Sequence, residues 1–63
     1  MKKWFLVSFK YSDKVYCTNL CVADSVEDVE KHYSAKYDWV SVKEAAEWEV
    51  DTYRHRGMSV IKL

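Results

Sequence analysis

The stretch Trp4-Phe5-Leu6-Val7-Ser8-Phe9-Lys10-Tyr11 decides the fold of this chain. It is rich in aromatic and β-branched residues, and every second residue from Phe5 to Tyr11 is apolar, so the pattern predicts a strand with one buried face. Ser12-Asp13-Lys14 has the composition of a turn, and the alternation resumes from Val15 to Ala23. The first 23 residues therefore predict a β-hairpin.

Two helices are predicted after the hairpin. Asp24 stands three residues before Glu27, which is the capping-box arrangement at a helix start, and the helix is expected to end near Lys36. Ser41-Val42-Lys43-Glu44 repeats that arrangement and predicts the start of a second helix. Its end is expected at Arg54-His55-Arg56-Gly57, where cations suit the helix dipole and glycine suits a left-handed cap.

Some segments keep two interpretations. Trp39-Val40 is either a short strand or an extended connection, and residues 44–53 alternate in a way that also fits a half-buried strand. The last residues, Met58–Leu63, predict a strand that joins the hairpin sheet. The expected fold is α+β: a small antiparallel sheet, made of the N-terminal hairpin and the C-terminal strand, packed against two helices in the order β-β-α-(β)-α-β.

Length and composition predict one soluble domain spanning residues 1–63. Hydrophobic residues make up 49% of the chain. Three Trp, five Tyr and two Phe are enough to build a core without disulfides or metal ions. No apolar run approaches the roughly 20 residues of a membrane span, and the start does not resemble a signal peptide, so the expected location is cytoplasmic. Two cysteines four residues apart on one strand are too distant for a disulfide.

The charge is zero overall but unevenly distributed. Residues 24–51 carry nine acids and three Lys, residues 1–23 carry four Lys and one Asp, and residues 52–63 carry two Arg and one Lys. Such a pattern is typical of solvated helix faces, and it also fits an acidic face that binds a basic protein partner. Both interpretations stay open at this point.

The leading hypothesis is a non-catalytic protein-binding module. If residues 44–53 are helical, Trp48 lies on the polar side of that helix, where an exposed Trp among acids is typical of an interface anchor. The candidate protein-binding residues are Trp48, Glu44, Glu47, Asp51 and His55. If the segment is a strand, Trp48 belongs to the core instead.

The alternative is a small nucleic-acid-binding protein that uses the sheet. Exposed aromatic side chains stack on bases, and neighbouring lysines contact phosphates. The candidate residues are Lys2, Lys3, Trp4, Lys10, Tyr11, Lys14 and Tyr16. Steep salt dependence would distinguish this mode from protein binding. Self-association through the edge strand Met58–Leu63, giving a homodimer, is a further alternative.

No catalytic residues, metal site or cofactor are expected. Cys17 and Cys21, with His32 and His55, match no zinc-ligand spacing, and no glycine-rich phosphate loop is present. A chain of this length has little room for the pocket of roughly 300 Å³ or more that small molecules occupy. The sequence therefore does not predict an enzyme.

The chain loosely resembles very small orphan proteins of bacterial mobile elements and prophages. The resemblance rests on Lys2-Lys3-Trp4-Phe5-Leu6-Val7, on Ala23-Asp24 to His32-Tyr33, and on Trp39-Val40-Ser41-Val42 to Arg56-Gly57-Met58. It includes no diagnostic motif and assigns no functional residue. That group includes anti-CRISPR proteins, so the resemblance implies an inhibitor that covers a surface of a host defence complex.

Overall fold

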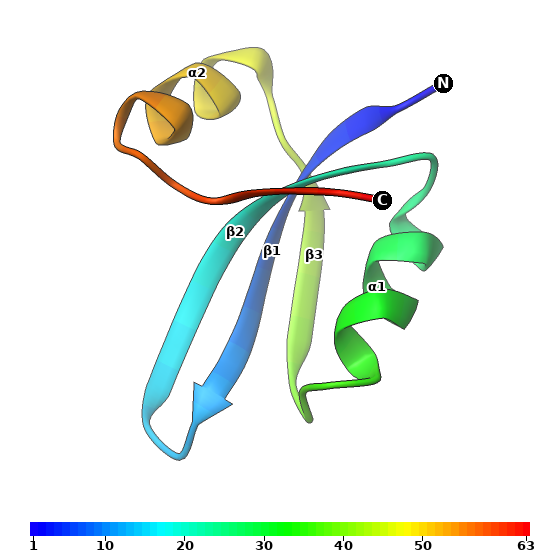
Figure 1. The fold of residues 1–63 in the computed structure, drawn as a ribbon, viewed down its shortest axis with the longest axis vertical. Coiled ribbons are helices and arrows are strands. Elements are labelled where there is room, and N and C mark those ends of the chain that lie inside the picture. Colours follow the sequence, from blue (N-terminus) through cyan, green and yellow to red (C-terminus); the bar gives the residue numbers. More distant parts are fainter.

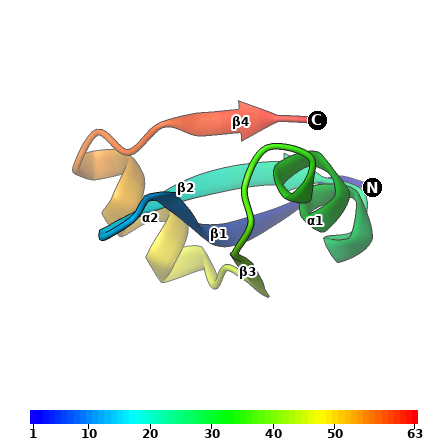
Figure 2. The ribbon, with the colours of Figure 1, turned by 90° about the horizontal axis from the view of Figure 1, so that it is seen from below.

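The computed structural model describes residues 1–63 and has four strands and two helices. They are β1 (Lys3–Ser12), β2 (Val15–Ala23), α1 (Val26–Ser34), β3 (Val40–Glu44), α2 (Glu47–His55) and β4 (Val60–Lys62). The strands form one sheet in the order β3-β1-β2-β4 (Figures 1 and 2). The predicted α+β fold and its element order are confirmed, and the optional strand after α1 is present.

The sheet is mixed, so the prediction of a purely antiparallel sheet is wrong for the C-terminal strand. β2 and β3 each run antiparallel to β1, whereas β4 runs parallel to β2. The chain leaves β3 at one edge of the sheet, passes through α2 and returns as β4 at the opposite edge (Figure 2). A helical crossover of this kind joins strands that point the same way.

One face of the sheet, called here the α1 face, carries the larger core. Alternate residues of β1 (Phe5, Val7 and Phe9) point to this face, where they pack with Cys21 and Ala23 of β2 and with Val29 and Tyr33 of α1. The Phe9 ring stacks on Tyr33 at 5.2 Å and on Tyr37 at 4.4 Å between ring centroids. These aromatic contacts extend the cover of α1 to the hairpin end of the sheet.

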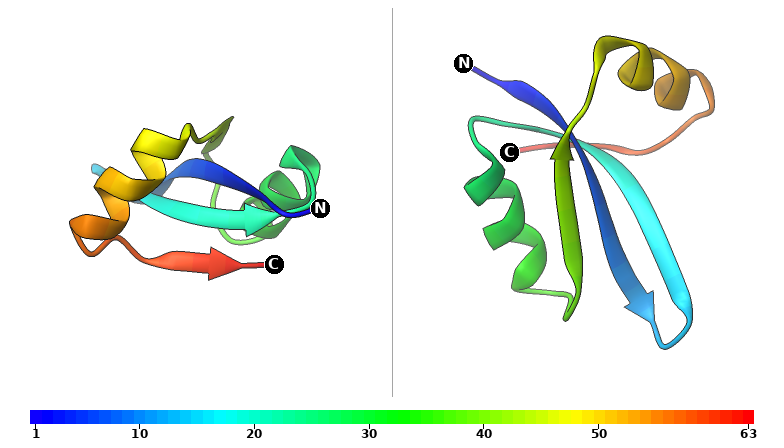
Figure 3. Two further views of the ribbon diagram at one scale, coloured as in Figure 1. Left: turned by 90° about the horizontal axis from the view of Figure 1, so that it is seen from above. Right: turned by 180° about the vertical axis from the view of Figure 1, so that it is seen from behind.

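The opposite face, the α2 face, is covered only at one end. Leu6, Leu20 and Val50 form a second, smaller core there. A nine-residue helix is about 13.5 Å long, whereas a ten-residue strand such as β1 extends over roughly 33 Å. One short helix cannot cover such a strand, and the turn between β1 and β2 projects far beyond α2 (Figures 1 and 3).

The first helix begins one residue later than predicted. Ser25 is the N-cap, and its hydroxyl accepts a hydrogen bond from the Asp28 amide at 3.3 Å. Asp24 forms ion pairs instead, with the N-terminal amine at 3.8 Å and with the Lys2 ammonium at 3.6 Å. The predicted Asp24 cap is therefore wrong, because a neighbouring residue of equal capping ability takes its place.

The predicted helix start at Ser41 is also wrong. Residues 40–44 form β3, and Val42 lies opposite Val7 of β1. The helix begins at Glu47, with Ala46 as N-cap; the Glu49 carboxylate accepts a hydrogen bond from the Ala46 amide at 3.1 Å. This is half of a capping box, because alanine has no side-chain oxygen to return the bond.

The helical interpretation of residues 47–53 and the stop signal after them are confirmed. Gly57 has φ 82°, the left-handed value that favours glycine. The Gly57 amide donates to the Arg54 carbonyl and the Met58 amide to the Tyr53 carbonyl, which is the Schellman pattern. The final strand is shorter than predicted, at Val60–Lys62. Neither helix is long and apolar enough to cross a membrane.

Candidate functional site

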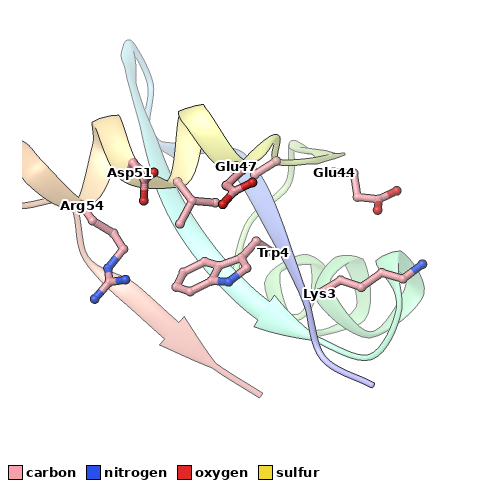
Figure 4. A pocket seen from close by; sticks show the side chains of 8 residues that line it. Lys3, Trp4, Glu44, Glu47, Asp51 and Arg54 are labelled. Atoms are coloured by element: carbon pink, nitrogen blue, oxygen red, sulfur yellow. The ribbon is translucent and has the colours of Figure 1, made fainter.

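An open cleft of about 440 Å³ lies between α2 and the first residues of β1 (Figure 4). It is larger than the chain length suggested, because it is a groove between two elements and not an enclosed pocket. Its lining is mostly charged and is named here the acidic cleft. The lining residues are Lys3, Trp4, Glu44, Ala45, Glu47, Val50, Asp51 and Arg54.

The acidic cleft brings together the three carboxylates that the sequence singled out. Glu47 and Asp51 project from α2, and Glu44 comes from the end of β3 and not, as predicted, from a helix. None of the three has an ion-pair partner, although Lys3 and Arg54 line the same cleft. Like charges four residues apart on a helix, such as Glu47 and Asp51, destabilise it by about 0.2–0.5 kcal/mol.

The aromatic residue in the acidic cleft is Trp4. Its half-buried indole packs against the core of Leu6, Leu20 and Val50. The guanidinium carbon of Arg54 lies 5.8 Å from the centre of the Trp4 ring, within the range of a cation–π contact. In Figure 4 the indole lies between the Arg54 and Lys3 side chains, beside Glu47 and Asp51. Trp4 is therefore part of the acidic cleft and does not lie on an open sheet.

Trp48 and His55 lie outside the cleft but next to it on α2. Trp48 is 68% exposed, which agrees with the helical interpretation, and His55 is exposed as well. Trp48 and His55 stand three residues before and four residues after Asp51, so both are its neighbours on the helix surface. The five predicted protein-binding residues thus form one continuous exposed region, called here the α2 surface: Glu44, Glu47, Trp48, Asp51 and His55.

Glu49 fixes the start of α2 and thereby the wall of the acidic cleft. It is 8% exposed, and besides the Ala46 amide its carboxylate accepts a hydrogen bond from the Lys43 ammonium at 3.0 Å. The backbone hydrogen bond from Ala46, followed by the bond from Lys43, lowers the pKa of Glu49 below its ordinary value of 4.5. This role of Glu49 was not predicted from the sequence, although Glu49 stands three residues after Ala46, at the capping-box distance.

Glu49 should make folding stability depend on acid pH. A carboxylate whose pKa is lowered by folding stabilises the protein above its unfolded-state pKa, and this stabilisation is lost as the pH falls through the folded-state pKa. We expect the free energy of unfolding, measured by urea denaturation, to decrease as the pH falls below about 4.5. The decrease should be smaller in Glu49→Gln, because its amide oxygen still accepts from Ala46 but cannot titrate.

The matched control for this prediction is Glu47→Gln, which removes an exposed carboxylate from the same turn without removing a hydrogen bond. Its unfolding free energy should follow the wild-type dependence on pH. An acid dependence in Glu49→Gln as steep as that of the wild type would contradict the role assigned to Glu49.

The predicted nucleic-acid residues are divided between two regions. Lys2 is paired with Asp24, and Lys3 and Trp4 line the acidic cleft. The others, Lys10, Tyr11, Lys14 and Tyr16, lie at the hairpin end of β1 and β2. The structure adds Trp39 to this second group, since its ring contacts Tyr16. The available signal was Trp39-Val40, an aromatic residue followed by a β-branched residue at the start of a possible strand.

Neither cysteine has the surroundings of a reactive thiol. Cys21 is fully buried, and burial raises the pKa of its thiol, which disfavours the nucleophilic thiolate. Cys17 is half-buried on the same face of β2, and the two do not form a disulfide. No group of three or more His, Cys, Asp or Glu side chains is arranged to hold a metal ion.

Comparisons with protein-family models, with curated proteins and with solved structures give no match to this chain. The strand order and the elements by themselves define the class: an α+β domain with a four-stranded mixed sheet and two helices.

Proposed function

We propose that this protein is a non-catalytic protein-binding module that holds a basic region of its partner against the α2 surface. The observation that carries the proposal is the combination, on one continuous surface, of three carboxylates without ion-pair partners and a Trp48 side chain that is 68% exposed. Exposed Trp residues are enriched among the residues that dominate binding energy at protein interfaces.

The electrostatics of the α2 surface favour a basic partner. Glu47 and Asp51 repel each other in the free protein. With Glu44, three carboxylates line the cleft against two cations, Lys3 and Arg54, so the lining carries an excess of one negative charge. A partner lysine or arginine placed between Glu47 and Asp51 would relieve their repulsion. Complementary charges of this kind mainly raise the association rate and fix the orientation of the partner, while a buried aromatic side chain supplies most of the affinity.

The proposal requires no cofactor and no reaction. A standard interface buries roughly 800 Å² on each partner, which is about a sixth of the 4651 Å² surface of this protein. The α2 surface together with the rims of the acidic cleft provides a region of suitable character for such contact. The thiols are inaccessible or half-buried, and this supports binding over covalent catalysis.

The nature of the partner is proposed from the resemblance to small proteins of mobile elements and prophages. We propose that the module inhibits a host defence complex by covering a basic surface, as an anti-CRISPR-like protein would. Complexes that handle nucleic acids carry basic surfaces for phosphate contacts, and an acidic protein surface can compete for them.

The test begins with the immobilised protein, a bacterial lysate, and a comparison with and without nuclease. A protein retained in stoichiometric amount after nuclease treatment is the expected result. With that protein purified, Trp48→Ala should weaken binding by about 30-fold or more, the loss expected for a residue that dominates an interface. Adding the triple change Glu44→Gln, Glu47→Gln and Asp51→Asn to Trp48→Ala should weaken binding of the partner further and reduce the salt dependence of that binding.

Two matched controls locate the effect. Trp39→Ala removes another exposed Trp at the far end of the sheet, and Glu27→Gln with Glu30→Gln neutralises exposed acids of α1. Both should bind as the wild type does. If no protein is retained, or if the partner binds Trp48→Ala as tightly as the wild type, the α2 surface is not the binding site.

A further inference from the structure

The hairpin half of the α2 face has no helix over it. The side chains on this half come from three strands and the residue before β3, and they are polar or aromatic. They are Ser8, Lys10, Tyr16, Thr18, Trp39 and Ser41, called here the open sheet face. All are exposed or half-buried, because α2 extends only over Leu6 and Leu20 at the other end (Figure 3).

Two aromatic rings stand together on the open sheet face without belonging to the core. The rings of Tyr16 and Trp39 have centroids 5.4 Å apart and meet edge to face at 89°. Tyr16 remains 61% exposed and Trp39 46% exposed. The backbone holds them in place, because Tyr16 pairs with Lys10 across the hairpin and the Lys10 amide donates to the Trp39 carbonyl at 3.0 Å.

The charges of the open sheet face suit an anionic ligand. It contains no carboxylate, and Lys10, in its centre, and Lys14, in the adjacent turn, make no ion pair. Two acids, Asp13 and Asp38, line a groove at the rim together with Lys10 and Lys36. The hydroxyl of Ser41 is a further donor, whereas the hydroxyls of Ser8 and Thr18 are hydrogen-bonded to each other at 3.1 Å. The acids of α1 lie beyond the opposite face of the sheet.

We infer that the open sheet face binds single-stranded nucleic acid, with bases on the Trp39 and Tyr16 rings and phosphates at Lys10 and Lys14. Base stacking on exposed aromatic residues beside lysines is the usual mode of sequence-tolerant single-strand binding. Unpaired bases are required, since a duplex keeps its bases stacked on each other. This second activity is separate from the α2 surface, which lies at the other end of the molecule.

The experiment measures fluorescence anisotropy of labelled oligonucleotides of about 12 nucleotides, oligo-dT and oligo-rU, with a duplex of equal length. At about 20 mM salt both single strands should bind and the duplex should bind more weakly. Comparing the affinity for oligo-dT with that for oligo-rU shows whether the protein prefers DNA or RNA. The logarithm of the binding constant should fall against the logarithm of salt with a slope of about −1.4 for two phosphate contacts.

Substitutions locate the site. Trp39→Ala and Tyr16→Ala should each weaken single-strand binding by about 5- to 150-fold, the range for loss of one stacked base. Lys10→Gln should reduce the salt slope by about 0.7. Trp48→Ala, which removes an even more exposed ring from the α2 surface, is the matched control and should bind as the wild type does. Thermal melts of each variant verify that the fold is kept.

The inference is overturned if neither single strand binds at low salt, if the duplex binds as tightly as the single strands, or if Trp48→Ala weakens binding as much as Trp39→Ala. It is also overturned if no oligonucleotide binds while Trp39→Ala abolishes the binding of a purified protein, because the open sheet face is then a protein interface.

Discussion

Phe9→Ala is expected to remove a large share of the free energy of unfolding of the protein at 25 °C. Phe9 is 5% exposed, and its ring stacks on both Tyr33 and Tyr37, so the substitution opens a cavity between β1 and the segment that carries α1. Truncating a buried Phe to Ala costs about 3–5 kcal/mol. A domain of 63 residues has a total stability of about 3–9 kcal/mol, so this single loss removes a large share of it.

Urea denaturation, monitored by near-ultraviolet circular dichroism, measures this loss of stability. The stacked rings give a signal that depends on fixed packing. The matched control is Tyr11→Ala, two residues farther along β1, where the ring is 63% exposed. It should change stability by about 0.5 kcal/mol or less, as surface substitutions do. A Phe9→Ala midpoint close to that of Tyr11→Ala would contradict the assignment of Phe9 to the core.

The β1–β2 hairpin and the end of α2 could be predicted from the sequence because their signals are local. The alternation from Phe5 to Phe9 identifies the face of β1 that carries the main core, although Leu6 on the other face is buried as well. Gly57 is also a local signal, because a glycine after a run of cations marks the end of a helix. Tyr11 departs from the pattern, because the pairing of β1 with β2 is irregular between Lys10 and Ser12 and the ring is exposed.

β3 was harder to predict, because it forms through pairing with a distant strand and not through a local sequence signal. Ser41 and Glu44 have the spacing of a capping box, and Ala45 and Ala46 after them favour a helix. In the structure β1 has an edge that needs a partner, and Val42 completes the core opposite Val7. Tertiary pairing therefore outweighs the local signal. The direction of β4 is likewise set by the path of the chain through α2.

The candidate site was partly predictable for a related reason. Helical spacing sufficed to group Glu47, Asp51 and Trp48, because these residues share one element. The position of Trp4 in the acidic cleft depends on which end of the sheet α2 covers, and no local pattern encodes that. The open sheet face became visible only with the fold, since it is defined by where the short helix ends.

The two ends of the α2 face explain how one small domain has two different surfaces. A single nine-residue helix covers Leu6 and Leu20, and its outer side becomes the α2 surface. Beyond the helix the same strands present hydroxyls, Lys10 and two rings to water. Because the division follows from the length of α2, a change in how α2 packs should affect the acidic cleft and leave the open sheet face largely unaltered.

Leu20→Ala tests this division and is expected to loosen α2 from the sheet. Leu20 is fully buried, pairs with Leu6 across the hairpin and forms with Val50 the small core that holds the helix. The truncation should cost about 2–5 kcal/mol. Amide hydrogen exchange should speed up most in α2 and β4, and affinity for a protein bound at the α2 surface should fall although no contacting residue has changed.

The matched control is Thr18→Ala, two residues away on the same strand and the same face, where the side chain is exposed. Thr18→Ala should keep the wild-type exchange rates in α2. The assignment is contradicted if Leu20→Ala retains full protection of the α2 amides, because the helix would then be held by something other than the Leu6, Leu20 and Val50 core. Nucleic-acid binding to the open sheet face should persist in the folded fraction of Leu20→Ala, because Tyr16 and Trp39 do not depend on α2 for their positions.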